Sequence, residues 1–335
     1  MGSRESRIRL VISRAPLRIA FAGGGTDLPD YYRRGYGAVL STPIDKYVYV
    51  TVKRHGTLFN EMYRLNYSET ENADRLEDIN NGIARECLRM LQIEPPIYIS
   101  TVADLPASTG LGSSSSFTVG LLNALHALRG EQVPAAQLAN EAATIEIEML
   151  GRPIGKQDQY AAAFGGLNYF RFMPDDSVTV EPQTMNDGAT EEMFSHLMLF
   201  WTGISRDSAT ILSEQLANID NRLDELATMR GHAAELKRML SNNFDAIGFG
   251  SLLGATWQLK RRLADTITNA RIDNWYQKAM DAGALGGKLC GAGGGGFLLF
   301  IVEPSHQQNV REALSDMTEI EFNYDARGSQ VVFAE

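Results

Sequence analysis

The sequence predicts an α+β protein built from two halves. Strand-like and helix-like segments alternate along the chain, but without the regular strand–helix–strand rhythm of a parallel α/β sheet. Residues 174–189 are polar and rich in turn-forming residues, and they divide the chain into expected domains at 1–180 and 190–335. The chain has 335 residues and 44% of them are hydrophobic, so each half is large enough to bury a core.

The first half opens with strands that glycines separate. Alternating apolar residues and β-branched residues predict strands at 7–13, 17–22, 38–42, 47–53, 97–101 and 167–170. Helical periodicity predicts helices at 72–92, 117–128 and 134–150. Pro95 and Pro96 follow the first of these helices and are expected to stop it, and Gly151 is expected to stop the third.

The second half is expected to be mostly helical between two sets of strands. A strand is predicted at 196–201, and helical periodicity extends over 208–282 with breaks near Gly231, Gly248 and Gly250. The remaining predicted elements are strands at 297–302, 320–324 and 330–333 and a helix at 305–317.

Composition excludes several classes of function. A formal net charge of −10 argues against a nucleic-acid-binding surface, because phosphate backbones require clustered Lys and Arg. No apolar run has membrane-spanning length and no signal-peptide pattern begins the chain, so we expect no membrane association. Cys87 and Cys290 are far apart and predict reduced thiols in the cytoplasm. The sequence does not decide between a monomer and a homo-oligomer.

The glycine- and serine-rich segment 105–117 predicts a phosphate site. It runs directly into a helix, and the free N–H groups and positive dipole at such a helix start attract anions. No Gly-Lys-Ser/Thr follows, so the loop is not a Walker A motif, and Ser115 stands where a dinucleotide fingerprint needs its third glycine. A nucleoside triphosphate is the first ligand to expect, and a plain strand-to-helix turn capped by serine is the alternative.

One glutamate of the predicted helix 134–150 lies on its apolar face. At 100° per residue Glu146 falls among the apolar side chains, whereas Glu141 and Glu148 point to the opposite face and are expected at the surface. A buried carboxylate requires a partner, and Mg²⁺ prefers carboxylate oxygens, so Glu146 is a candidate magnesium ligand.

Three further segments carry candidate site residues. Asp158 follows this helix within a glycine-containing turn and is a candidate general base, with a turn or cap residue as the alternative. Asp27 follows three glycines and could accept hydrogen bonds from sugar hydroxyls, or else cap a turn. Consecutive glycines at 293–296 lose much conformational entropy on folding, which favours close approach of a ligand to the backbone over a merely flexible loop.

The three glycine segments, in this order, resemble the GHMP kinases, the family of galactokinase, homoserine kinase, mevalonate kinase and phosphomevalonate kinase. Residues 14–28, 105–117 and 288–297 resemble its first, second and third motifs, and the second follows the pattern Pro-x-x-x-Gly-Leu-Gly-Ser-Ser. The resemblance implies a ribosomal-protein-S5-like N-terminal domain and a ferredoxin-like C-terminal domain with the active site between them.

The resemblance also implies residue roles. Asp158 takes the place of the catalytic aspartate, and Arg18 that of the basic residue beside it. Ser114 and Glu146 match the ligands of a Mg²⁺ ion that accompanies ATP. The implied ATP-binding residues are Pro106, Ser108, Gly110, Leu111, Gly112, Ser113, Ser114 and Ser115. The implied substrate-binding residues are Gly24, Gly25, Thr26, Asp27, Asp158, Gly293 and Gly294.

The form of the first motif bears on the substrate. Gly24 and Gly25 stand where galactokinases have Glu-His, and the segments 23–32 and 41–46 most resemble the D-glycero-D-manno-heptose 7-phosphate kinases. This implies phosphorylation of a sugar phosphate at C1, with Arg33, Arg34, Lys156 and Arg206 as candidates for holding the 7-phosphate. The alternatives are an L-fucose or related sugar 1-kinase, a catalytically silent sugar-binding regulator and, with less support, an NAD-binding oxidoreductase.

Overall fold

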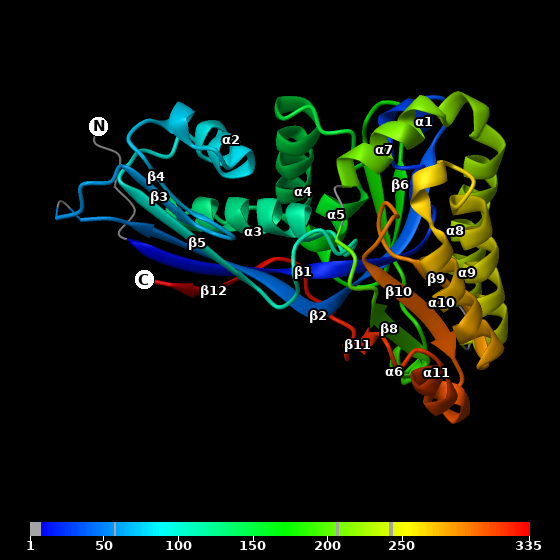
Figure 1. The fold of residues 1–335 in the computed structure, drawn as a ribbon. Helices are drawn as coiled ribbons and strands as arrows, with labels where there is room; N and C mark the ends of the chain where they lie inside the picture. Colours follow the sequence, from blue (N-terminus) through cyan, green and yellow to red (C-terminus); the bar gives the residue numbers. More distant parts are fainter. Residues whose placement is uncertain (1–7, 57, 206–207, 241–243) are drawn as a thin grey trace.

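The computed structural model, which describes residues 8–56, 58–205, 208–240 and 244–335, is an α+β structure with two sheets (Figure 1). The larger sheet has the order β12 (Gln330–Ala334), β1 (Leu10–Ala22), β2 (Gly37–Arg54), β5 (Ile97–Ala103), β3 (Tyr63–Asn66) and β4 (Thr70–Ala73). Strand β6 (Asn168–Phe172) also pairs with β2, and β7 (Val178–Pro182) pairs with β6. The smaller sheet has the order β11 (Thr318–Glu319), β8 (Leu197–Trp201), β10 (Phe297–Val302) and β9 (Ala284–Leu289).

The two longest strands, β1 and β2, run through positions where the sequence predicted breaks. The predicted strands 7–13 and 17–22 are replaced by one continuous strand that begins at Leu10, and 38–42 with 47–53 likewise form one strand; Arg7 lies outside the described residues. The antiparallel register between β1 and β2 shifts at Pro16/Leu17, so the proline interrupts the ladder without ending the strand. One ribbon therefore connects the Gly23 turn to the rest of the larger sheet.

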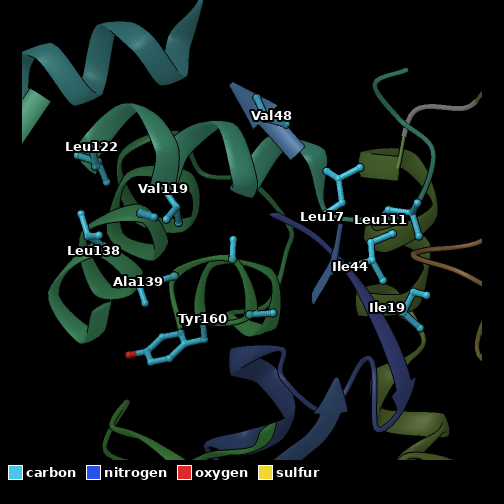
Figure 2. Packing of buried hydrophobic residues seen from close by; sticks show 14 of the residues in the cluster. Leu17, Ile19, Ile44, Val48, Leu111, Val119, Leu122, Leu138, Ala139 and Tyr160 are labelled. Carbon is cyan, nitrogen blue, oxygen red and sulfur yellow. The ribbon is translucent and has the colours of Figure 1, made fainter. Parts of the chain in front are cut away.

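Four helices cover one face of the larger sheet: α2 (Gly82–Met90), α3 (Ser113–Leu128), α4 (Ala135–Ala143) and α5 (Gln157–Phe164) (Figure 1). Helix α3 approaches the sheet closely at Gly120, where an added Cβ would lie 3.3 Å from Val50. Figure 2 shows Val119 and Leu122 of α3 near Leu138 of α4 and Tyr160 of α5. The start of α3 is joined to β1 by a hydrogen bond from the Ser116 hydroxyl to the Pro16 carbonyl at 2.7 Å.

Helices α9 (Ala246–Lys260) and α10 (Ala270–Asp281) pack against the smaller sheet, whereas α8 (Leu223–Leu240) packs against α9 and against β1 and β2 of the larger sheet. Together with α7 (Ser208–Ala217) they form the right side of Figure 1. Their core includes the fully buried rings of Trp257, Trp275, Phe200 and Phe300. The shorter helices are α1 (Pro29–Tyr32), α6 (Ala189–Ser195) and α11 (Gln307–Ala313). None of the described helices combines the length and apolar character needed to span a membrane.

The chain ends in the sheet of the first half. Strand β12 pairs antiparallel with β1, from Val11 opposite Ala334 to Arg14 opposite Gln330, and the two strands lie together in Figure 1. The expected strand at 320–324 is instead a single bridge between Ile44 and Tyr324. The division into domains at 1–180 and 190–335 stays a prediction.

Two predicted helices of the first half differ from the structure in extent or type. Only 82–90 of the expected helix 72–92 is helical, because the Asn81 side chain accepts the Ala84 N–H and begins the helix there. The earlier residues form β4 and a 3₁₀ turn, Leu76–Asp78. The helix expected at 134–150 continues beyond α4 only as a π-helical turn, Thr144–Met149.

Three corrections concern polar and glycine-rich segments. The segment 174–189, expected to be a linker, contains β7. Gly231 lies within α8, and Gly248 and Gly250 lie within α9, so none of them breaks a helix. Gly250 instead permits close packing of α9 on β9, because a Cβ added at Gly250 would lie 2.7 Å from Cβ of Leu285.

Candidate active site

A cavity of about 520 Å³ brings the three glycine segments together. Its wall takes residues from the end of β1, the loop before α3, the segment before α5, helices α7 to α9 and the loop after β9. Site residues predicted from sequence that line it are Arg18, Gly24, Gly25, Asp27, Ser108, Gly110, Gly112, Ser113, Ser114, Ser115, Glu146, Asp158 and Gly293. Among the described residues the set lacks the predicted Pro106, Leu111, Thr26 and Gly294.

The loop before α3 has the geometry of an anion site. Gly110 and Gly112 have φ angles of +84° and +80°, and Gly112 is the N-cap of α3. The helix begins at Ser113, four residues before the expected start, so the serines supply the N–H groups of its first turn. Ser114 and Ser115 also line the cavity with this turn.

Two predicted loop residues serve the structure of the loop. Leu111 is fully buried, and its carbonyl accepts the N–H of Arg18, which ties the loop to β1. A Cβ at Gly110 would lie 2.5 Å from the carbonyl oxygen of Cys290, so the second and third glycine segments meet with no room for a side chain. The loop therefore depends on glycine for both its φ angles and its neighbours.

Glu146 is fully buried, as its position on the helical wheel predicted, whereas Glu148 is exposed. Burial raises the pKa of Glu146, and hydrogen bonds from Ser115, Ser114 and Gln159 with the charge of Arg152 oppose that rise. The Ser115 and Gln159 side chains donate to Oε2 at 2.7 and 2.8 Å.

The other oxygen of Glu146, Oε1, already contacts a cationic group. Ser114 Oγ donates to Glu146 Oε1 at 2.8 Å, and Nη1 of Arg152 donates to Ser114 Oγ at 2.7 Å and to Glu146 Oε1 at 3.0 Å. A cationic nitrogen bridging two oxygen ligands shows that this corner of the cavity accommodates positive charge. The described residues hold no cluster of three His, Cys, Asp or Glu side chains suited to a metal, so a magnesium ion here would need oxygen ligands from phosphates or water as well.

Arg18 and Asp158 form a two-point ion pair in the cavity wall. Nε and Nη2 of Arg18 donate to the two Asp158 oxygens at 2.7 Å each, and Nη1 donates to the Gly110 carbonyl at 2.7 Å. Asp158 lies in the first turn of α5, not in the turn expected from the sequence. The Arg18 side chain is 6% exposed and that of Asp158 25%, so the carboxylate remains open to a ligand.

Asp27 is buried beneath the first glycine turn. Its Oδ1 accepts the Gly25 N–H at 2.9 Å and the Gln157 side-chain amide at 3.0 Å. Burial, and then the charge of Asp158, raises its pKa. Thr26 builds the turn itself, because its hydroxyl donates to the Gly23 carbonyl at 2.7 Å.

The cavity is also lined by two lysines that the sequence analysis did not assign to the site. Lys260 ends α9 and Lys288 lies in β9, and both are 8% exposed. Burial lowers the pKa of each to about 8. The sequence did carry one signal for Lys260, which ends an apolar helix that also contains Trp257 and Leu253. A lysine is seldom buried in such a helix unless it has a partner or a ligand.

The basic residues expected to hold a sugar 7-phosphate lie elsewhere. Arg33 pairs with Asp176, and Lys156 donates to the Asp176 carbonyl at 2.9 Å. Arg34 pairs with Asp220. Among the described residues, these three are not in the cavity wall, and Arg206 lies outside the described residues.

Comparison with known proteins shows which family this chain belongs to. The models of the GHMP kinase N-terminal and C-terminal domains match residues 79–166 and 227–319. A D-glycero-alpha-D-manno-heptose 7-phosphate kinase from Campylobacter jejuni is 31% identical over 92% of this chain and 94% of its own. An L-fucokinase/L-fucose-1-P guanylyltransferase from Bacteroides fragilis is 26% identical over 92% of this chain but 36% of its own.

Solved structures agree. The crystal structure of a D-glycero-D-manno-heptose 1-phosphate kinase from Bacteroides thetaiotaomicron superposes with a TM-score of 0.78 at 28% identity, covering 96% of this chain and 99% of the other. The fold and the comparisons define a phosphotransferase, and the chain belongs to the GHMP kinases. It is a sugar kinase that uses ATP as its phosphoryl donor.

Proposed function

We propose that the chain phosphorylates the anomeric C1 hydroxyl of D-glycero-D-manno-heptose 7-phosphate, giving the 1,7-bisphosphate for nucleotide-heptose and surface polysaccharide synthesis. The observation that carries the proposal is the Arg18–Asp158 pair beside the loop that opens α3. It is supported by the 31% identity to a relative named for this substrate.

The phosphates of ATP would bind at the start of α3. N–H groups of Ser113 to Ser115 and the helix dipole supply fixed partial positive charge there, without side-chain rearrangement. Ser114 and Glu146 would hold Mg²⁺, which neutralises charge that develops on the transferring phosphoryl group.

Asp158 would act on the acceptor. Its carboxylate accepts the proton of the C1 hydroxyl as that oxygen forms a bond to the γ-phosphorus and the bond from phosphorus to the ADP oxygen breaks. Arg18 orients Asp158 through both carboxylate oxygens and also contacts the Gly110 carbonyl of the phosphate loop. One arginine thus fixes the base relative to the loop that binds the donor.

The sugar would lie against the first glycine turn. Gly24 and Gly25 leave the backbone open to the cavity, and Asp27 faces it with Oδ1 held by Gly25 and the Gln157 side chain, and with Oδ2 accepting the Gln157 backbone N–H at 3.3 Å. Gly293 adds open backbone from the third segment.

Free, buried Cys87 and Cys290 support the assignment to the reducing cytoplasm.

An L-fucose or related sugar 1-kinase is the second candidate, favoured by the 26% identity to the Bacteroides fragilis fucokinase over most of this chain. A panel of free sugars and sugar phosphates in an ADP-release assay separates the two. We expect a heptose 7-phosphate to give the highest kcat/KM, with L-fucose and galactose as poor substrates. Faster turnover of L-fucose or of an unphosphorylated hexose would leave the kinase assignment intact and refute the heptose 7-phosphate assignment.

A further inference from the structure

Four basic side chains line the cavity among the described residues: Arg18, Arg152, Lys260 and Lys288. The two arginines are engaged with carboxylates, Arg18 with Asp158 and Arg152 with Glu146. Neither is available to a further anion without breaking an ion pair that belongs to the phosphoryl-transfer machinery. The two lysines are therefore the candidates for binding a charged group on the acceptor.

The two lysines differ in how well the protein satisfies them. Lys288 Nζ donates to the Ala20 carbonyl at 2.6 Å and lies 3.4 Å from the Phe21 carbonyl. Lys260 Nζ has one long hydrogen bond, 3.4 Å, to Oε1 of Gln215. An ammonium has three donors, so two of those on Lys260 lack a partner among the described residues. A buried cation left in this state is costly unless a ligand completes it.

Gln215 sets the position of Lys260. It is buried on α7, and its side-chain nitrogen donates to the Ala292 carbonyl at 3.1 Å, which leaves Oε1 for Lys260. Ala292 belongs to the third glycine segment and lines the cavity. The lysine head is thus held at the cavity wall by a side chain that is itself anchored to the site.

The local charge favours an anion. Lys260 experiences the attraction of Asp27 and Asp158 and the repulsion of Arg18. Lys288 in turn experiences repulsion from Lys260 and Arg18. Three cations therefore gather around two carboxylates, inside a protein whose net charge is −10. This part of the cavity attracts an anionic acceptor that the molecule as a whole repels.

We infer that Lys260, positioned by Gln215, binds the phosphate monoester of the acceptor sugar. The phosphate oxygens supply the hydrogen-bond acceptors that the protein withholds from this lysine, and charge-assisted bonds of this kind are strong in a buried setting. The inference rests on the proposed function and names the residue that distinguishes a sugar phosphate from a free sugar. It replaces Arg33, Arg34 and Lys156, which pair elsewhere.

The test compares two acceptors on three proteins. Steady-state kcat/KM is measured for D-glycero-D-manno-heptose 7-phosphate and for the unphosphorylated heptose with wild type, Lys260→Gln and Arg33→Gln. Arg33 is an exposed arginine beyond the cavity wall and serves as the matched control. Wild type is expected to prefer the phosphorylated acceptor by on the order of 10²-fold, since two or three charge-assisted hydrogen bonds supply at least that much. Lys260→Gln should reduce the preference to below about 10-fold through KM of the sugar phosphate, and Arg33→Gln should keep it.

Three other results have separate meanings. A wild type without preference for the phosphorylated acceptor refutes the proposed substrate, and with it this inference. A wild type that prefers it while Lys260→Gln keeps the full preference refutes the inference alone. If Lys260→Gln lowers kcat/KM equally for both acceptors, the lysine binds the sugar ring and not the phosphate. This result also overturns the inference. Two measurements confirm that Lys260→Gln is folded. Its thermal stability should match or exceed that of wild type, and its KM for ATP should match that of wild type.

Discussion

Glu146 and Lys260 are both buried charged side chains in the wall of one cavity, but they differ in the number of their partners. Glu146 accepts hydrogen bonds from Ser114, Ser115, Arg152 and Gln159. Lys260 has one long bond to Gln215. The first arrangement maintains the shape of the donor site before any ligand arrives. The second leaves bonding capacity for a ligand, and this is the kind of group through which a site selects its substrate.

The largest expected effect is on Asp158, which lines the same cavity as Glu146 and Lys260. Asp158→Asn keeps the size of the side chain but cannot accept the proton, so turnover should fall by on the order of 10² to 10⁴. ATP binding, measured by calorimetric titration, should persist. The exposed Asp220→Asn is the control and should leave turnover unchanged. Near-wild-type turnover of Asp158→Asn would remove this residue from the mechanism.

The donor site should be intolerant of a single methyl group. Gly110→Ala places a Cβ 2.5 Å from the Cys290 carbonyl oxygen at a φ of +84°, so we expect a loss of unfolding free energy of about 2 kcal/mol or more together with weaker ATP binding. Gly151→Ala tests φ alone, because Gly151 has a φ of +62° and nothing within 4 Å of an added Cβ. Chemical denaturation of both variants measures the difference, and equal losses would show that the contact with Cys290 is unimportant.

Lys260 should lower the free energy of unfolding of the protein although it contributes to binding of the acceptor. Its folded pKa of about 8 lies below the ordinary value of 10.5, so the unfolded state binds more protons between these pH values and wild-type stability rises with pH across that window. Lys260→Met, which cannot titrate, should exceed wild type by on the order of 1–3 kcal/mol below pH 8, and the advantage should shrink as pH approaches 10.5. Asp27, Asp158, Arg18 and Lys288 face this lysine and set the size of the effect. A pH-independent difference in denaturation free energy would contradict the account.

The smallest effect expected is on the affinity for MgATP. Glu146→Gln removes a charge from the proposed magnesium ligand, so the dissociation constant for MgATP should rise on the order of 10-fold or more, and more Mg²⁺ should be required for turnover. The exposed Glu148→Gln lies two residues away and should change neither. Equal effects of the two substitutions in calorimetric titrations would show that Glu146 does not bind the metal ion.

The sequence predicts the donor site better than the acceptor site, for a physical reason. Burial of Glu146 follows from helical periodicity, and the turns at Gly110 and Gly112 follow from glycine, because both are local properties. The position of Asp158 on a helix was missed because α5 is short and its apolar residues are mostly alanine. Lys260 lines the cavity in a structure where α9 packs closely on β9, and periodicity does not reveal such a tertiary contact.

The product formed from heptose 7-phosphate and ATP tests the central claim most directly. Phosphorus NMR of the wild-type reaction, with magnesium present, should show a new phosphate coupled to the anomeric proton at C1 while the phosphate at C7 remains. The same reaction with Asp158→Asn should show no such signal over the same time. Transfer to any other hydroxyl, or no transfer to this sugar alongside efficient transfer to L-fucose, would contradict the account.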